Sequence, residues 1–222
     1  MRAKELRAKA RENLAGNWGL SVGVALIAGL LGGAANSVTS GFSIQIDAEL
    51  LPELPPVVLQ VLVAYFGFTA IRSLIIFIIG GTIQLGYTRY LLKQYGKVRS
   101  LGLNDLFSQF HRFGQGFAQA FLRNLYTFLW TLLFIIPGIV KSYAYAMTPF
   151  IMAENPDMSA SEAIRISKRI MKGNKGRLFC LDLSFFGWGL LCALTLGIGT
   201  LFLNPYTNAS RAAFYRSLNY ED

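Results

Sequence analysis

Long apolar runs separated by short polar stretches dominate the pattern of this chain. One run begins after residue 17, and others occupy residues 57–92, 117–153 and 178–203. An α-helix needs about 20 mostly apolar residues to cross the hydrocarbon core of a bilayer. The pattern therefore predicts an all-α, polytopic transmembrane bundle of about six spans arranged as hairpins, in a single membrane domain over residues 1–222.

Charged residues and turn formers divide the first half of the chain. A first span is predicted over residues 18–38, where glycine and alanine favour close helix packing. The 57–92 run is too long for one straight span, and Arg72 interrupts it. We therefore expect an interfacial helix over residues 57–70 and a span over residues 73–92.

Proline and glycine place a turn in the middle of the third run. Pro137 and Gly138 are expected to end a span over residues 117–136, because proline lacks the amide N–H and glycine allows a tight turn. A short span over residues 139–153 would then return across the bilayer.

The last apolar region can be interpreted as one long span or as a hairpin. We favour a hairpin that turns near residues 196–199 and continues to about residue 216. It places Arg211 and Arg216 on the same side of the membrane as the other basic clusters.

Two amphipathic surface helices are predicted outside the spans. Residues 1–16 contain strong helix formers and a weak apolar stripe, and we expect them to lie on the inner membrane surface. Residues 157–173 form the second, beginning at Ser159 and Glu162, which fit a capping box. Its basic side predicts contact with lipid headgroups or a cytosolic surface, through residues Arg165, Lys168, Arg169 and Lys172.

Charge is concentrated beside the apolar runs. Sixteen of the 21 Lys and Arg residues lie in residues 1–17, 93–123 and 154–177. Nucleic-acid binders instead present a basic face with base-reading groups, so we expect no nucleic-acid partner. The bias predicts a multi-pass protein of the cytoplasmic membrane with both termini inside, in contact with anionic headgroups. The N-terminal run imitates a signal peptide, but Glu5 and Glu12 among the preceding basic residues favour a retained segment.

The composition of the chain gives little indication of catalytic chemistry. Hydrophobic residues make up 53% of the chain and charged residues 15%, against about 25% charged in soluble domains. The single histidine, His111, lies in a basic loop, and both cysteines fall in one apolar run. Without a recognisable nucleotide, zinc or hydrolase signature, we expect no catalytic residues, no cofactor and no metal site.

A few polar residues inside or beside the spans form a candidate intramembrane polar site. They are Arg72, Lys141, Asp182, Asn124 and Asn204. Asp182 is the most informative, because an intramembrane carboxylate needs a partner or water. It belongs either to a proton or cation path or to a structural arrangement, in which it pairs with Arg123, Lys141 or Arg72 or reaches the interface near Arg177. We favour the structural arrangement.

Three segments resemble a known family. They are ELRAKARENLAGNWGL at the start, LWTLLFIIPGIVKSYAYAMTPFIMAENPDMSASEAIRISKRIMKG in the centre and LTLGIGTLFLNPYTNASRAAFY near the end. They are similar to the bacterial integral membrane family filed as domain of unknown function 975. The organisation also looks, more loosely, like the membrane domain of some glycerophosphodiester phosphodiesterases. The resemblance implies a multi-span membrane protein and no catalytic residue.

Two functions from different classes remain open at this point. We favour a non-enzymatic protein that scaffolds, assists or regulates envelope components, with a membrane protein as its partner. The alternative is a transporter or channel for a small anionic or lipidic solute. An intramembrane lipid enzyme has the least support, because no acid–base pair is recognisable.

Overall fold

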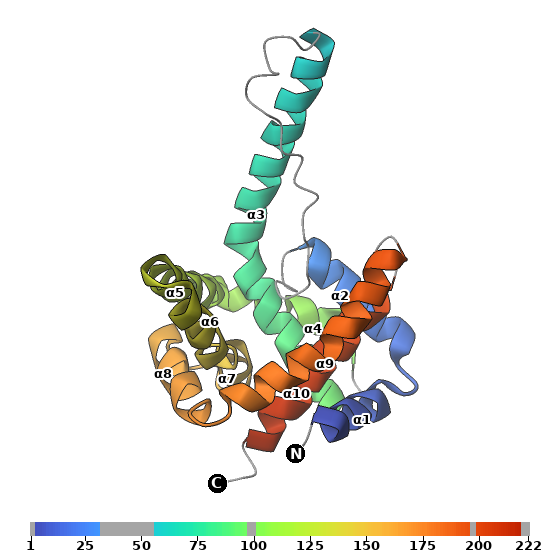
Figure 1. Cartoon of the computed structure of the whole chain (residues 1–222), viewed down its shortest axis with the longest axis vertical. Coiled ribbons are helices and arrows are strands. Elements are labelled where there is room, and N and C mark those ends of the chain that lie inside the picture. Colours follow the sequence, from blue (N-terminus) through green and yellow to red (C-terminus); the bar gives the residue numbers. More distant parts are fainter. Residues whose placement is uncertain (1–2, 32–55, 97–100, 196–198, 219–222) are drawn as a thin grey trace.

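The computed structural model describes residues 3–31, 56–96, 101–195 and 199–218, and every regular element in these ranges is helical. The all-α class is therefore confirmed for this part of the chain. Short and medium helices form a body around one end of a single long helix, whose other end projects far from the body (Figure 1).

The elements, in chain order, are α1 (Ala3–Leu14), α2 (Trp18–Leu30), α3 (Pro56–Tyr95), α4 (Asn104–Phe107), the 3-10 turn η2 (Phe110–Arg112), α5 (Phe113–Leu133), α6 (Ile135–Ala144), α7 (Thr148–Glu154), α8 (Ala160–Ile170), α9 (Lys175–Leu194) and α10 (Thr200–Leu218).

The long helix α3 is continuous, so the predicted division into an interfacial helix over residues 57–70 and a span over 73–92 is wrong. Arg72 has good helix propensity, and α3 contains no proline after its first residue, so no residue stops the helix. The helix changes environment instead. Its side chains are mostly exposed up to Ile79 and almost all buried from Gly80 to Leu92.

The six-span arrangement is not supported by the described residues. Among them, only the segment Val63–Tyr95 of α3 is long and apolar enough to cross a bilayer. Helix α2 has 13 residues, and the rest of the predicted span over 18–38 lies outside the described residues. The predicted span over 139–153 is two helices, α6 of 10 residues and α7 of 7. Each is too short, because a residue adds about 1.5 Å of helix.

Helices α5 and α6 form a hairpin, but its turn is not at Pro137. The chain breaks at Phe134, whose backbone is extended with φ −157° and ψ 137°. Pro137 lies in the first turn of α6, where its missing N–H has no helical partner to lose. Gly138 permits the close return, because a Cβ there would lie 2.3 Å from the Thr131 Oγ1 atom.

The C-terminal hairpin is confirmed. Helices α9 and α10 are joined by a short connection and pack against each other. The tip predicted near 196–199 lies mostly outside the described residues.

The apolar side of α1 faces protein, which corrects the expectation that it lies on lipid. Leu6, Ala10 and Leu14 are each at most 1% exposed, and α1 packs mainly against α10. The stripe recognised in the sequence is therefore a core-facing stripe.

Helix α8 is amphipathic as predicted, but its apolar side also faces protein. Its capping box is present, with the Ser159 hydroxyl accepting a hydrogen bond from the Glu162 amide at 3.3 Å. Ala163 and Ser167 are buried, and the Ser167 hydroxyl donates to the Ala144 carbonyl at 2.8 Å. The helix packs against α7 and α5, which leaves only its basic side for contact with lipid or a partner.

Polar contacts fix the buried half of α3. The Gln94 amide donates to the Ser21 hydroxyl of α2 at 2.7 Å, and that hydroxyl lies 3.1 Å from the Tyr90 hydroxyl. On the other side, Lys93 forms an ion pair with Asp105 at the start of α4. Buried polar groups need such partners, so these contacts set the position of α3 against its neighbours.

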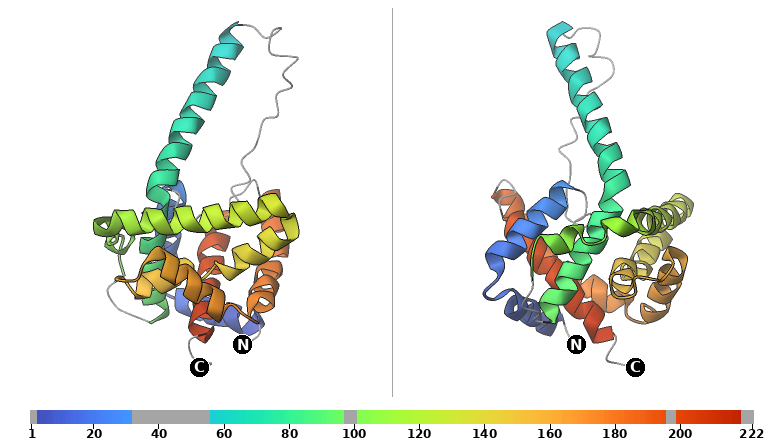
Figure 2. Two further views of the ribbon diagram at one scale, coloured as in Figure 1. Left: turned by 90° about the vertical axis from the view of Figure 1, so that its left-hand side faces the viewer. Right: turned by 180° about the vertical axis from the view of Figure 1, so that it is seen from behind.

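Helix α5 lies across α3 rather than alongside it (Figure 2). The two helices approach most closely at a pair of glycines. A Cβ at Gly81 would lie 2.3 Å from the Gly116 carbonyl oxygen, and a Cβ at Gly116 would lie 2.8 Å from the Thr82 Cα. Glycine at both positions therefore allows the two backbones to approach this closely.

Replacing Gly81 with alanine is expected to lower the free energy of unfolding by roughly 1–3 kcal/mol, because the added methyl group overlaps the backbone of α5. The matched control is Gly67→Ala in the same helix, where a Cβ would meet nothing within 4 Å. There, alanine should be neutral or stabilising by up to about 1 kcal/mol. Thermal unfolding in mild detergent measures both. Equal melting temperatures for the two variants would contradict the close crossing.

Candidate functional site

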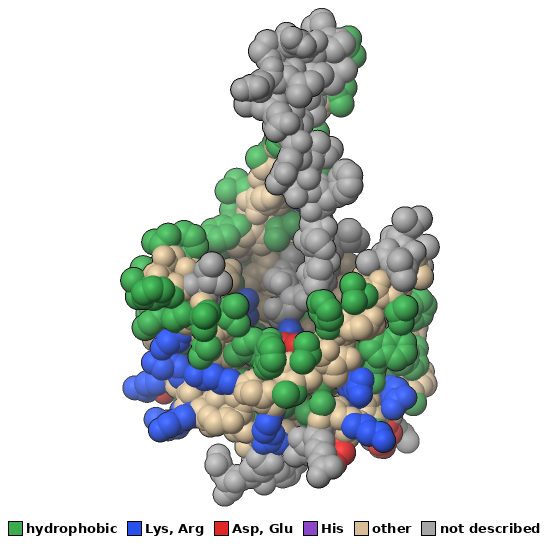
Figure 3. All heavy atoms as spheres, viewed as in Figure 1, with side chains coloured by type: hydrophobic (Ala, Val, Ile, Leu, Met, Phe, Trp, Pro, Cys, Tyr) green, Lys and Arg blue, Asp and Glu red, His purple; other side chains and the backbone are tan. Residues whose placement is uncertain are grey.

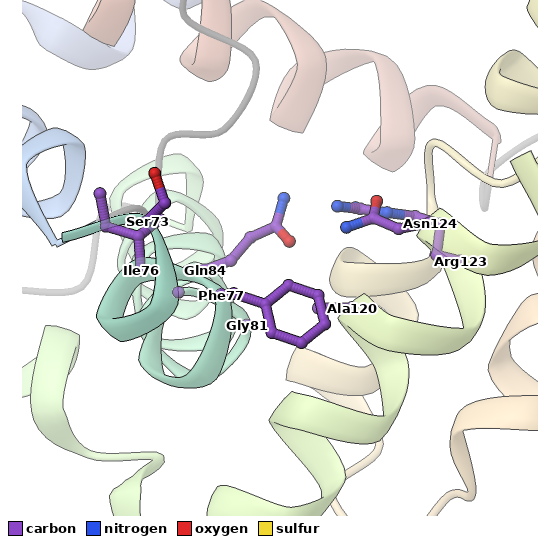
Figure 4. Close-up of a pocket in the computed structure, with 9 residues that line it drawn as sticks. Ser73, Ile76, Phe77, Gly81, Gln84, Ala120, Arg123 and Asn124 are labelled. Carbon is purple, nitrogen blue, oxygen red and sulfur yellow. The ribbon is translucent and has the colours of Figure 1, made fainter. Parts of the chain in front are cut away.

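A cavity of about 300 Å³ lies between α3 and α5, beside the point where the two helices cross at Gly81 and Gly116, here called the glycine crossing. Its polar lining comes from both helices, with Ser73 and Gln84 on α3 and Arg123 and Asn124 on α5. Figure 4 shows Gln84 and Arg123 extending toward each other from these two helices. The remaining lining is apolar, with Phe77 among it.

The glycine crossing determines where these side chains meet. Gly81 and Gln84 are three residues apart on α3, and Gly116 and Arg123 are seven apart on α5. Residues at these spacings share a helix face. The face that brings the two backbones together therefore also carries Gln84 and Arg123 toward the other helix.

The polar groups of the cavity have unused hydrogen-bonding capacity. Gln84 is only 6% exposed, yet within the described part of the chain its side-chain amide has no hydrogen-bond partner. The same holds for the side chains of Arg123, Asn124 and Ser73. Ser73 and Asn124 are exposed and Arg123 is half-buried, so the donors of this cavity are open to water or to a polar ligand.

An ion pair lies next to the cavity. The Arg211 guanidinium of α10 binds the Asp182 carboxylate of α9 through both oxygens, with Nη2 at 3.0 Å from each. Arg211 is close enough to Arg123 to repel it electrostatically, and Tyr143 of α6 lies close to Asp182. Because the one carboxylate of this group is already paired with Arg211, Arg123 adds an uncompensated positive charge.

The five residues of the predicted polar site are distributed over different surroundings. Asn124 lines the cavity, while Asp182 is paired with Arg211 rather than with any of the three partners proposed from the sequence. The Lys141 ammonium lies over the Trp130 ring, 4.2 Å from its centroid. Arg72 lines a separate, mostly apolar cavity, and Asn204 is half-buried in α10.

Sequence reasoning did not assign Gln84, Arg123 or Arg211 to a site. Gln84 had a usable signal, because it is the one side-chain amide in the predicted span over residues 73–92. Arg123 was considered only as a partner for Asp182. Arg211 follows Asp182 by 29 residues, and no helical periodicity connects two positions on opposite arms of a hairpin.

The basic residues of α8 lie on its surface, at the positions that the sequence predicts. Arg165, Lys168, Arg169 and Lys172 are all exposed. Their contact with headgroups or a partner stays a prediction.

A second ion pair ties the end of the chain to the body. The Glu154 carboxylate of α7 accepts from Arg216 Nη1 at 2.7 Å and from the Tyr215 hydroxyl at 2.7 Å. Tyr215 is buried and stacks on Phe150, with ring centroids 5.4 Å apart. In the described ranges no three His, Cys, Asp or Glu side chains gather where they could hold a metal ion.

A family model described as protein of unknown function (DUF975) matches residues 132–222. This segment of the chain is therefore similar to the DUF975 family. The matched part runs from the end of α5 through α10 and includes the ion pairs Asp182–Arg211 and Glu154–Arg216. Gln84 and Arg123 lie before it, as do all the other residues that line the cavity.

No curated protein and no solved structure matches this chain. The looser resemblance to the membrane domain of glycerophosphodiester phosphodiesterases stays a hypothesis.

Breaking the Asp182–Arg211 pair of the DUF975 segment should destabilise the fold. The two side chains are 19% and 18% exposed, so Asp182→Asn should lower the free energy of unfolding by roughly 1–3 kcal/mol, between the values for exposed and buried pairs. Arg165→Gln, which breaks an exposed pair with Glu162, should cost less than about 1 kcal/mol.

A double-mutant cycle with Arg211→Gln and Asp182→Asn tests the coupling in thermal unfolding. The double variant should lose less stability than the sum of the single variants, because neither charge is then left alone. Strictly additive losses would argue that the pair does not stabilise the protein.

Proposed function

We propose that this protein is embedded in a membrane through the exposed half of α3 and an apolar band on its body, and that it acts there without catalysis as a scaffold or regulator. The observation that supports it is the exposed apolar surface of α3. Large side chains such as Phe68 and Leu74 are 68% and 61% exposed, and the most apolar window of the helix is only 6% buried.

Water is an unfavourable surrounding for such a surface. Exposed apolar area costs about 25 cal/mol per Å², and a contiguous patch on this scale usually marks a membrane or a partner. The exposed part of α3, residues 57–79, would extend about 35 Å at 1.5 Å per residue, enough to cross a hydrocarbon core of about 30 Å. Hydrocarbon is therefore the occupant that fits this face.

The side chains on the body are sorted in the same direction. Figure 3 shows hydrophobic side chains along the part of the body nearest the projecting half of α3, and Lys and Arg side chains below them. Leu129, Leu133, Phe186 and Trp188 are among the exposed apolar side chains of α5 and α9 in the body. Such an arrangement suits a body half-inserted in one leaflet, with its basic rim among anionic headgroups.

This orientation places the basic side in the cytoplasm. Helices α1 and α8 and the end of α10 lie at the end of the body away from the projecting half of α3 (Figure 1). Short basic segments remain on the cytoplasmic side of bacterial membranes, so we propose that both termini are cytoplasmic. Arg72 is a cation within the exposed part of α3, and its long stem can carry the charge toward the interface.

A scaffolding role agrees with the chemistry that is available. Within the described residues, the cavity lining contains no His, Cys, Asp or Glu, so it offers no acid–base pair. The exposed basic side of α8 suits a partner with an acidic surface or the headgroups of the inner leaflet.

The alternative is a transporter or channel for a small anionic or lipidic solute. It is favoured by the cavity and by the uncompensated charge of Arg123. Flux of an anion into proteoliposomes that is lost in Asp182→Asn, with folding retained, would support this alternative over the scaffold.

The membrane anchor is tested by replacing Ile71, Leu74, Ile75 and Ile78 together with serine. Because these side chains supply the apolar surface of the projecting helix, most of the protein should move from the pellet to the supernatant after alkaline carbonate extraction. Glutamine at the four basic α8 positions serves as the control and should leave the protein in the pellet. Persistence of the serine variant in the pellet would show that α3 is not the anchor.

The scaffold role predicts a partner that co-purifies in mild detergent. Charge reversal by Lys168→Glu and Arg169→Glu on α8 should reduce capture of that partner severalfold, because both side chains are exposed. The matched control is Lys4→Glu and Arg11→Glu on α1, which are also exposed. If the protein purifies alone from native membranes under several mild conditions, the scaffold role loses its support.

A further inference from the structure

The cavity between α3 and α5 carries a positive charge without a counter-ion. In the described part of the chain, no carboxylate forms an ion pair with Arg123. The nearest carboxylate does not neutralise this charge, because Asp182 is held by Arg211 through both oxygens. An arginine keeps its charge in proteins, so the cavity favours an anion.

The other polar groups of the cavity suit the oxygens of one kind of anion. Gln84 and Asn124 each supply an amide N–H₂ donor, and Ser73 supplies a hydroxyl donor. The guanidinium fork of Arg123 matches the geometry of phosphate, to which it binds through two parallel hydrogen bonds. The hydrogen-bond donors that α3 and α5 place around Arg123 therefore match the acceptor oxygens of a phosphate group.

The size and the surroundings of the cavity point to phosphate attached to lipid. A volume of about 300 Å³ is at the low end for ligand pockets, sufficient for a headgroup but small for a whole lipid. Aromatic rings border it, with Phe77 lying 5.7 Å from Phe117 and 6.3 Å from Phe121 between centroids. Phe77 and Phe121 are 48% and 41% exposed, so apolar surface continues outward from the cavity.

We propose that this cavity binds the phosphate group of an anionic phospholipid, with Arg123 as the clamp, Gln84 and Asn124 as amide donors, and the acyl chains lying along the exposed apolar sides of α3 and α5. The lipid part of this inference rests on the proposed membrane placement. The phosphate part rests on the donor set alone.

The test uses the full-length protein in nanodiscs of phosphatidylcholine with added phosphatidylglycerol, and measures retained phosphatidylglycerol by native mass spectrometry. Arg123→Gln should lower the affinity for phosphatidylglycerol about tenfold or more, the effect of losing a charge-assisted bidentate contact. Arg123→Lys should restore part of it, because the charge remains without the fork. Arg165→Gln removes the same charge from the exposed rim and should change the affinity less than about twofold.

Two further experiments distinguish lipid phosphate from free phosphate and cover the case in which Arg123→Gln does not fold. Gln84→Leu keeps the shape of the side chain without its donors and should weaken binding severalfold, so it decides the matter if Arg123→Gln does not fold. In detergent, inorganic phosphate is added as the free probe. Binding of inorganic phosphate that depends on Arg123, without retention of phosphatidylglycerol, would overturn the lipid and assign a solute site.

Unchanged retention in Arg123→Gln and Gln84→Leu, both folded by circular dichroism, would overturn the site as a whole. Carbonate extraction of the same variants distinguishes this result from failure of the membrane proposal. Variants that stay in the pellet but show no phosphate preference contradict the cavity only. A wild-type protein that leaves the pellet contradicts the membrane placement.

Discussion

The close crossing of α3 and α5 at Gly81 and Gly116 is the constraint on which most of this structure depends. A side chain larger than hydrogen at either position would overlap the backbone of the other helix. The contact fixes where α3 enters the body, and thus where its buried half ends and its exposed half begins. It also carries Gln84 and Arg123 into the same cavity, because they lie on the same helix faces as the glycines.

Electrostatics then distinguishes two arginines that look alike in the sequence. Arg211 is held by both oxygens of Asp182, which ties α10 to α9 and uses the charge for the fold. Arg123 has no such partner among the described residues and lies beside unpaired amides. A paired arginine stabilises a structure, whereas an unpaired one in a half-buried cavity is available to a ligand. This difference is the reason why we place the binding chemistry at Arg123.

The distribution of apolar surface joins these local features to the proposed role. The body buries the apolar stripes of α1 and α8, so those helices stabilise the fold and leave basic sides outward. The exposed half of α3 and the apolar band on the body have no protein to cover them in the described chain. In the membrane placement that we propose, lipid would cover the apolar surfaces, and headgroups with a partner would cover the basic sides. The cavity lies where the long helix leaves the body.

The sequence by itself determined the helical class, the C-terminal helical hairpin, the capped amphipathic helix α8 and the likeness of residues 132–222 to the DUF975 family, because these depend on local periodicity, caps and motifs. Its six-span count failed because apolar runs indicate burial without saying whether lipid or protein provides it, as the buried α7 and the core-facing stripe of α1 show. Which partner Asp182 takes, and that Gln84 and Arg123 meet, depended on how helices cross. Only the tertiary structure decides that, because Asp182 and its partner Arg211 are 29 positions apart, and Gln84 and Arg123, which line one cavity, are 39 positions apart, with no local pattern to relate them.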